Sequence, residues 1–362
     1  NMNVPFIDLQ AQYQRYKSEI DIAIHDVLDT SQYIMGPKVK EFEDNLAKFS
    51  GAKHAIGCAS GTDALLLALM AIGIETGDEI ITTPFTFIAS SEVISLLGAI
   101  PVFVDIEQDT YNINADLIEA KITNKTKAIM PVSLYGQTAD MDKINAIGKK
   151  HNLIVIEDAA QSFGATYKGK QSCNLSDFGC TSFFPSKPLG CYGDGGALFT
   201  SNDELAEKAR IILAHGSKKR YEHTVIGING RLDAIQAAIL NVKLKYFSDE
   251  VQKRNLIGQK YIDLLSDKGI KTPIIKEGRT SVYAQFTLQV DNRQELIDKL
   301  KDNGIPTVIH YPKPLHLQEC YSFLNYSLGD FPISEKAAKE VFSLPMSPFL
   351  SEEHQEIITQ LI

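Results

Sequence analysis

Residues 182–197 have the sequence SFFPSKPLGCYGDGGA, and they say more about this chain than any other segment. They place a single lysine, Lys187, among apolar and loop-forming residues. A desolvated ammonium loses its proton more easily than one in water, and the free amine can form a Schiff base with an aldehyde. By itself, an exposed loop lysine would be the simpler interpretation. A reactive lysine is favoured by an upstream segment, Glu157-Asp158-Ala159-Ala160-Gln161, where an acid ends a buried apolar run.

Composition and charge exclude several classes of protein. The 362 residues are 44% apolar, which suits two packed domains better than one core. A net charge of −9 argues against a nucleic-acid partner. No apolar run approaches the roughly 20 residues of a membrane helix, and the first residues do not resemble a signal sequence. Five cysteines without CxxC spacing are typical of free thiols, so we expect a cytoplasmic protein with no membrane partner.

Residues 54 to 200 alternate short β-branched runs with helical patterns, which is typical of a parallel sheet with crossover helices. The expected strands are His54–Cys58, Glu79–Thr83, Pro101–Val104, Lys127–Val132, Leu153–Glu157, Phe178–Phe183 and Gly196–Thr200. We therefore predict an α/β fold with a seven-stranded, mostly parallel sheet. Ligands of such sheets bind beyond the carboxyl ends of the strands, where four polar loops converge, at residues 60–63, 85–87, 158–161 and 182–187.

The later part of the chain has a different pattern. A helical stretch from Leu232 to Arg254 leads to a strand-like run at Ser281–Val290, a helix at Arg293–Asn303 and a further strand at Pro306–His310. These elements predict a smaller α+β domain that shares the long helix with the first. We place the large domain at residues 1–248 and the small C-terminal domain at residues 249–362.

The segment Ser60-Gly61-Thr62-Asp63 immediately precedes an apolar helical run. A glycine turn at a helix start presents unpaired backbone N–H groups and the positive end of the helix dipole, which together bind an anion such as phosphate. Ser182 could add a hydroxyl donor to the same phosphate. A plain helix cap is the alternative interpretation.

Asp158 follows the apolar run Leu153–Ile156, so its carboxylate ends a strand buried on both faces, where an unpaired charge is costly. It needs a cationic partner, and a protonated pyridine nitrogen would serve. Phe87 could stack flat on such a ring, although a core phenylalanine is the simpler interpretation.

Two further observations on the sequence argue against a metal site and against a nucleoside-triphosphate site. The sequence has no HExxH pair or Cys/His ladder, so we predict no metal. Residues Gly164–Lys170 have P-loop spacing, but Gln171 stands where a magnesium-binding hydroxyl belongs. A hairpin turn is the better interpretation.

These features occur together in the order and rough spacing of a pyridoxal-phosphate (PLP) aminotransferase with an aspartate-aminotransferase-like fold, PLP fold type I. From end to end, the chain resembles the DegT/DnrJ/EryC1/StrS family of nucleotide-sugar aminotransferases. The motifs that carry the resemblance are Gly61-Thr62-Asp63-Ala64-Leu65, residues 157–161, 182–187 and 193–197, Asn229-Gly230-Arg231-Leu232-Asp233 and His310-Tyr311-Pro312. The resemblance implies PLP as cofactor and an amino-group transfer to a sugar.

The resemblance also implies a role for each site residue. Lys187 would hold PLP covalently and shuttle a proton, and Asp158 would pair with the pyridine nitrogen. The other cofactor contacts would come from Gly61, Thr62, Asp63 and Ser182 at the phosphate, Phe87 on one ring face and Gln161 near the phenolic oxygen. In similar enzymes an Asn at the place of Asn229 reaches the phosphate of the neighbouring subunit. A homodimer with shared active sites is therefore expected.

The implied substrates are L-glutamate, which leaves as 2-oxoglutarate, and a nucleotide-linked keto sugar. Residues 193–197 resemble members that aminate at C3″. Residues 183–194 resemble those that act on UDP-2-acetamido-2-deoxy-3-keto-glucuronate in O-antigen lipopolysaccharide biosynthesis. Arg231 offers a planar fork to the carboxylate of that sugar, although Arg at this place is also similar to neutral-sugar members. His310 and Tyr311 would face the sugar or its diphosphate, with a hydrogen-bonded pair at a strand end as an equal alternative.

Other functions stay open. A dTDP-3-keto-6-deoxyhexose C3″ aminotransferase, or a C4″ aminotransferase, would differ only in its acceptor. A sugar dehydratase of similar fold would replace Lys187 by His. A non-catalytic PLP-binding regulator would be expected to carry a DNA-binding module, and the sequence shows none.

Overall fold

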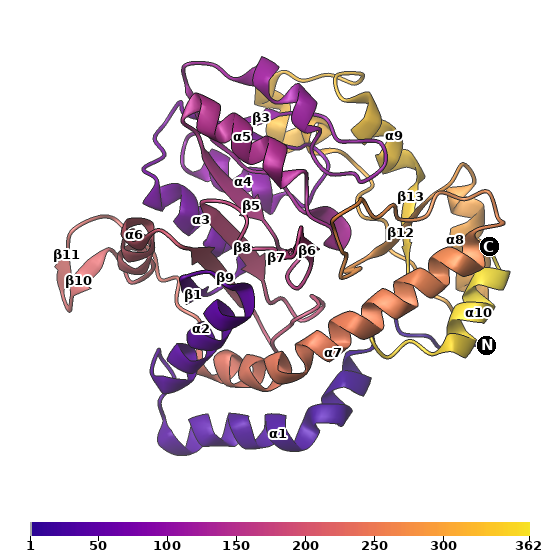
Figure 1. The fold of residues 1–362 in the computed structure, drawn as a ribbon, viewed down its shortest axis with the longest axis horizontal. Helices are drawn as coiled ribbons and strands as arrows, with labels where there is room; N and C mark the ends of the chain where they lie inside the picture. Colours follow the sequence, from indigo (N-terminus) through magenta and orange to yellow (C-terminus); the bar gives the residue numbers. More distant parts are fainter. Residues whose placement is uncertain (1) are drawn as a thin grey trace.

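The computed structural model describes residues 2–362, and a single sheet of seven strands lies at its centre (Figure 1). The sheet has the order β1-β9-β8-β5-β4-β2-β3. Its strands are His54–Cys58 (β1), Glu79–Thr82 (β2), Ile100–Phe103 (β3), Thr126–Ile129 (β4), Ile154–Asp158 (β5), Phe178–Ser182 (β8) and Gly196–Thr200 (β9). Neighbouring strands from β8 to β3 are parallel, and β9 is antiparallel to both of its neighbours. The predicted seven-stranded, mostly parallel α/β sheet is confirmed.

Helices bury both faces of this sheet. They are α1 (Leu9–Thr30), α2 (Pro37–Ser50), α3 (Gly61–Ala71), α4 (Ala89–Leu96), α5 (Met141–His151), α6 (Asp203–Leu213) and the first half of α7 (Ala234–Leu265). Successive residues on a strand point to opposite faces. On β5, Ile156 accordingly joins the cluster formed with α3, α4 and α6, whereas Val155 packs with α5. Such two-sided burial explains why these strands are almost continuous apolar runs.

Two short hairpins leave the sheet. The first pairs Thr166–Tyr167 (β6) with Lys170–Gln171 (β7), which confirms the hairpin predicted for the segment with P-loop spacing. The second pairs Ser217–Lys219 (β10) with Glu222–His223 (β11) and projects from the body of the molecule at the left of Figure 1.

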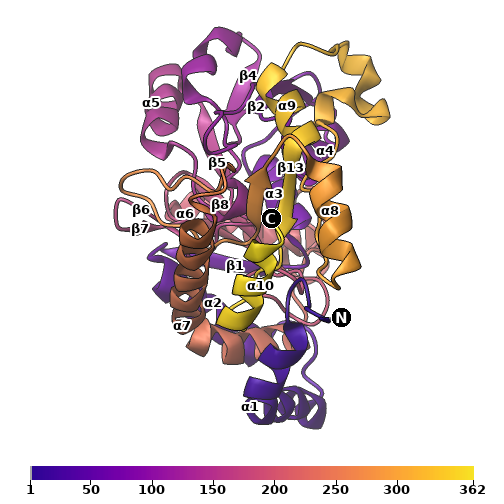
Figure 2. The ribbon, with the colours of Figure 1, turned by 90° about the vertical axis from the view of Figure 1, so that its right-hand side faces the viewer.

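Helix α7 leads from the sheet to a second, smaller region (Figures 1 and 2). The elements of this region are Phe286–Gln289 (β12), Arg293–Asp302 (α8), Pro332–Glu340 (α9), Val341–Leu344 (β13) and Glu352–Gln360 (α10). Its core contains Phe286 and Phe342 from the antiparallel β12–β13 pair, and Val4 from the N-terminal segment packs against them. The division at residue 248 falls inside α7 and stays a prediction. Within residues 2–362, no helix is long and apolar enough to cross a membrane.

Several predicted boundaries in this smaller region are wrong. Pro306–His310 forms no strand, because only Val308 bridges to Ser343 and Pro306 has no N–H to donate. The strand expected at Ser281–Val290 shrinks to β12. Its first residues turn aside, where the N–H of Val282 donates to the carbonyl of Gly136. Helix α7 runs to Leu265, since Tyr261 and Leu265 continue its buried face.

Candidate active site

A cavity of about 450 Å³ opens at the carboxyl ends of the parallel strands, where the sequence predicted a site. Predicted site residues from five separate segments line it: Gly61, Thr62, Phe87, Asp158, Gln161, Ser182, Lys187, His310 and Tyr311. The structure therefore brings together residues that are more than 200 positions apart in the sequence. Asp63, Asn229 and Arg231 do not line this cavity within the described chain.

The start of α3 forms an anion cradle at one end of the cavity. Ser60 caps the helix, and its Oγ accepts a hydrogen bond of 3.0 Å from the N–H of Asp63. The cap leaves the N–H groups of Gly61 and Thr62 at the open end of the helix dipole. A Cβ on Gly61 would lie 2.7 Å from the Cβ of Ser182, so only glycine lets α3 and β8 approach this closely. Asp63 serves the cap with its backbone.

Asp158 is a buried carboxylate at the end of β5. The hydroxyl of Ser90 donates to its Oδ2 at 2.6 Å, and the N–H of Ala160 donates to its Oδ1 at 3.2 Å. Burial raises the pKa of Asp158, while these hydrogen bonds and the charge of Lys187 act in the opposite direction. A cation bound beside it would hold the carboxylate in its ionised form.

Lys187 lies on the cavity wall in the loop between β8 and β9, where its N–H donates to the carbonyl of Phe184 at 2.9 Å. Burial lowers the pKa of its ammonium, and the charge of Asp158 partly opposes this shift. Among residues 2–362, no hydrogen-bond partner is found for its Nζ. The structure thus presents a desolvated amine to the cavity, which is the condition for a nucleophilic lysine.

Gln161 connects the sheet edge to the smaller region. Its Oε1 accepts from the N–H of Tyr135 at 2.7 Å, and its Nε2 donates to the hydroxyl of Tyr311 at 2.9 Å. His310 is paired through Nδ1 with the hydroxyl of Ser343 at 3.0 Å. Burial, with a contribution from Lys187, lowers the pKa of His310 to about 4, so this ring is neutral at pH 7.

Asn229 and Arg231 lie on one extended segment that precedes α7. Asn229 bridges to Ala214 and is exposed, while Arg231 bridges to Cys58 at the end of β1. The Nε of Arg231 is buried, and no partner for it is found among residues 2–362. Residues two apart on an extended segment point to the same side. Asn229 is therefore open to a molecule outside this chain's own cavity, whereas Arg231 is half-buried beside it.

Sequence reasoning missed three residues of the site. Ser90 belongs to a pair of buried serines in the first turn of α4, and that pattern could have identified it. Gln285 lines the cavity from the apolar run before β12, and a polar residue there was also a usable signal. Tyr135 acts through its backbone N–H, for which a sequence gives no signal.

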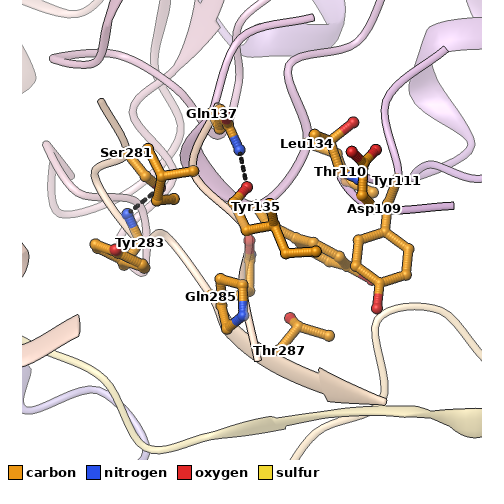
Figure 3. Close-up of a pocket in the computed structure, with 13 residues that line it drawn as sticks. Asp109, Thr110, Tyr111, Leu134, Tyr135, Gln137, Ser281, Tyr283, Gln285 and Thr287 are labelled. Atoms are coloured by element: carbon orange, nitrogen blue, oxygen red, sulfur yellow. Dashed lines mark hydrogen bonds between the residues drawn. The ribbon is translucent and has the colours of Figure 1, made fainter. Parts of the chain in front are cut away.

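Gln285 also lines a second and much smaller cavity, shown in Figure 3. That cavity is about 20 Å³, enclosed by Tyr111, Tyr135 and Thr287 among others, and has room for about one water molecule. Of the two cavities that Gln285 lines, only the one that Lys187 also lines is large enough for a substrate.

The residues present fit PLP. A cradle that a Cβ would fill suits the phosphate, the desolvated amine of Lys187 suits the aldehyde, and buried Asp158 suits a protonated pyridine nitrogen. Phe87 is 58% exposed although it lines the cavity, so it presents an apolar face to a ring. This fold and this site define a PLP-dependent enzyme of fold type I.

The chain belongs to the DegT/DnrJ/EryC1/StrS aminotransferase family, whose sequence pattern matches residues 14–362. It is 54% identical over 355 residues to the UDP-2-acetamido-2-deoxy-3-oxo-D-glucuronate aminotransferase of Pseudomonas aeruginosa, covering 98% of each chain. A Pleiotropic regulatory protein of Geobacillus stearothermophilus is 49% identical, over 100% of this chain and 98% of its own.

Among solved structures, NtdA from Bacillus subtilis with bound cofactor PMP superimposes with a TM-score of 0.93 at 33% identity. The match covers 99% of this chain and 84% of NtdA. The predicted aspartate-aminotransferase-like fold, the PLP cofactor and the enzyme class are thereby confirmed, and this protein is a PLP-dependent sugar aminotransferase.

Proposed function

We propose that this protein transfers the amino group of L-glutamate to C3″ of a UDP-linked 3-keto sugar, most specifically UDP-2-acetamido-2-deoxy-3-keto-glucuronate. The observation that carries the proposal is the placement of a desolvated Lys187 and a buried Asp158 on one cavity wall, beside the N-terminus of α3. The amine, the acid and the anion cradle match the aldehyde, the pyridine nitrogen and the phosphate of one PLP molecule.

The roles of the chain's own residues follow from their positions. The N–H groups of Gly61 and Thr62, together with the Ser182 hydroxyl, would bind the phosphate, and Phe87 would cover one ring face. Gln161, held by Tyr135 and Tyr311, would donate toward the phenolic oxygen. PLP supplies an electron sink that carries the amino group between the two substrates. Lys187 Nζ would then move the proton at the α-carbon of glutamate and, in the reverse sense, at C3″ of the sugar.

A homodimer would complete each site. Asn229 is exposed and faces away from its own cavity, which supports its reaching the phosphate in a neighbouring subunit. Mixing Lys187→Ala protein with Asn229→Ala protein tests this sharing. Each mixed dimer has one site with both residues intact, so recovery of about a quarter of wild-type activity is expected from random mixing. No recovery, with both variants folded and exchanging subunits, would contradict shared sites.

The choice of a uronate acceptor rests on two observations. The chain is 54% identical to the Pseudomonas enzyme, and Arg231, which lies two residues from Asn229 and outside its own cavity, would offer its guanidinium to the sugar carboxylate in the neighbouring subunit's site. Arg231→Met should raise KM for the UDP-linked uronate by about 10-fold to 100-fold and leave KM for the neutral UDP-linked 3-keto-N-acetylglucosamine unchanged. Equal changes for both sugars would contradict carboxylate recognition.

The enzyme assignment and its lysine are tested together. Purified protein incubated with PLP should develop an absorbance band that disappears with glutamate, and borohydride reduction should fix the cofactor on the peptide that contains Lys187. A band that glutamate leaves unchanged would favour the regulator, and a label elsewhere would overturn the site. Turnover of dTDP-linked 3-keto-6-deoxyhexose in preference to the UDP-linked uronate would replace the proposed acceptor.

A further inference from the structure

A buried lysine of helix α7, Lys243, contacts the loop that carries Lys187. The Nζ of Lys243 donates to the carbonyl of Gly190 at 2.7 Å and lies 4.3 Å from the centre of the Tyr192 ring. Lys243 is 1% exposed, and Gly190 O is its one hydrogen-bond partner within residues 2–362. The active-site cavity does not include Lys243.

A second side chain of α7 grips the same loop. Gln236 accepts from the N–H of Tyr192 at 2.8 Å and donates to the carbonyl of Tyr192 at 3.0 Å. Gln236 and Lys243 are seven residues apart, so two helical turns place them on one face of α7. Together they form three hydrogen bonds to the backbone of residues 190 and 192.

The loop has few bonds of its own. Pro185 and Pro188 lack an N–H, and two backbone bonds are found within residues 183–191, from Lys187 N to the carbonyl of Phe184 and from Cys191 N to the carbonyl of Phe183. The loop also folds back closely, because a Cβ on Gly190 would lie 2.4 Å from the carbonyl oxygen of Pro185. A displacement of Gly190 would therefore be transmitted to the turn that presents Lys187.

The chemistry of Lys243 argues for a positional role over simple core filling. Burial lowers its pKa to about 8, and a residue such as Met would fill the same space without a desolvated amine. The charge of Glu250, seven residues further along α7, favours the ammonium form of Lys243. The carboxylate oxygens of Glu250 accept hydrogen bonds from Gln12 and Tyr16 and none from Lys243. What Lys243 adds over Met is its hydrogen bond to Gly190 and its ammonium over the Tyr192 ring, and both contacts are to the loop.

We propose that Gln236 and Lys243 are positioning residues that fix the Lys187 loop against α7, and thereby the orientation of Lys187 in the cavity. The inference rests on the proposed role of Lys187 as the cofactor-binding lysine. Misplacing a reacting group by even about 1 Å is costly. When the hydrogen bonds of Gln236 or Lys243 to the loop are removed, kcat should therefore fall by about 10-fold to 100-fold, with KM nearly unchanged.

The test compares Lys243→Met and Gln236→Leu with Lys245→Met, a matched change on the exposed side of α7. Replacing a buried charge by an apolar residue is often neutral or stabilising, so Lys243→Met should keep or raise the unfolding temperature while kcat falls. Hydrogen exchange of the cofactor-free protein should become faster in the peptide covering 183–195. Lys245→Met should change neither readout.

Two results would overturn the proposed positioning role of Gln236 and Lys243. One is an unchanged kcat and exchange rate in both variants, and the other is a loss of kcat that follows a fall in unfolding temperature, which indicates a merely structural role. If Lys243→Met does not fold, the half-buried Gln236→Leu decides the question. A wild-type protein labelled by PLP elsewhere than Lys187 would refute the proposed function itself, and that result is separate from either outcome.

Discussion

Half-buried Lys187 and fully buried Lys243 are two amines in settings that lead to opposite expectations. Burial lowers the pKa of both, and that of Lys243 falls to about 8. Lys187 lies on the cavity wall near Asp158, with no hydrogen-bond partner for its Nζ among residues 2–362. Lys243 is enclosed and donates to a carbonyl. From this comparison we expect that burial prepares an amine for deprotonation, and that only the amine with access to a cavity, Lys187, can act as a nucleophile.

Lys187→Ala is the strongest test of this contrast. Turnover should fall by about 10⁴-fold or more, because no other lysine among residues 2–362 lines the cavity. Steady-state assays and borohydride labelling measure the effect, and the far-UV circular dichroism should match wild type. Lys243→Met should retain the label. The contrast is broken if the Lys187→Ala protein still transaminates or if Lys243 becomes labelled.

Asp158→Asn tests the charge that distinguishes the surroundings of Lys187. Its kcat should fall by roughly 10³-fold, since a neutral amide cannot keep a pyridine nitrogen protonated. Asp194→Asn removes the other carboxylate of the cavity wall, but Asp194 is exposed, so we expect a loss of less than about tenfold. Equal losses in the two variants would show that Asp158 has no special role.

The pH dependence of the free energy of unfolding should reveal the lowered pKa of the enclosed Lys243 amine. The folded-state pKa of Lys243, about 8, lies below its ordinary value of 10.5, so the unfolded chain binds more protons between these values. The free energy of unfolding of wild type should therefore rise with pH relative to that of Lys243→Met, by up to about 3 kcal/mol. Denaturant unfolding of the cofactor-free proteins at pH 7.5 and pH 10 measures this. The corresponding difference for Lys245→Met, at an exposed site, should not rise.

Much of the cavity could be predicted from the sequence because its residues follow directly on strands or begin helices. Asp158 and Ser182 end the neighbouring parallel strands β5 and β8, so both lie at the carboxyl edge of the sheet. Gly61 follows β1, which runs in the same direction as β8 because β9 lies between them and is antiparallel to both. Lys187 could be predicted for a similar reason, since it follows β8 by a few residues. Local pattern and sheet topology determine these positions together.

The remaining contacts depend on long-range backbone geometry. Tyr135 holds Gln161 through an N–H, and Lys243 reaches Gly190 across more than 50 residues, so neither contact leaves a local pattern. In the smaller region, β13 pairs with a β12 shorter than expected, and Val308 adds one bridge in place of the strand predicted at Pro306–His310. Short edge elements of this kind are set by packing more than by propensity.

Ser90→Ala should give the smallest effect, and it tests how the charge near Lys187 is kept. The Ser90 hydroxyl lowers the pKa of Asp158 against the burial that raises it, so its loss should raise that pKa further. The carboxylate is then protonated at a higher pH as the pH falls. The acidic limb of the kcat profile should move to higher pH, with a loss of about tenfold near that limb. Ser91→Ala is the matched control, because Ser91 bonds to Tyr321 and leaves Asp158 untouched. An unshifted acidic limb in Ser90→Ala would mean that the bound cofactor alone keeps Asp158 ionised. The surroundings of Lys187 and Lys243 would then differ only in access to the cavity.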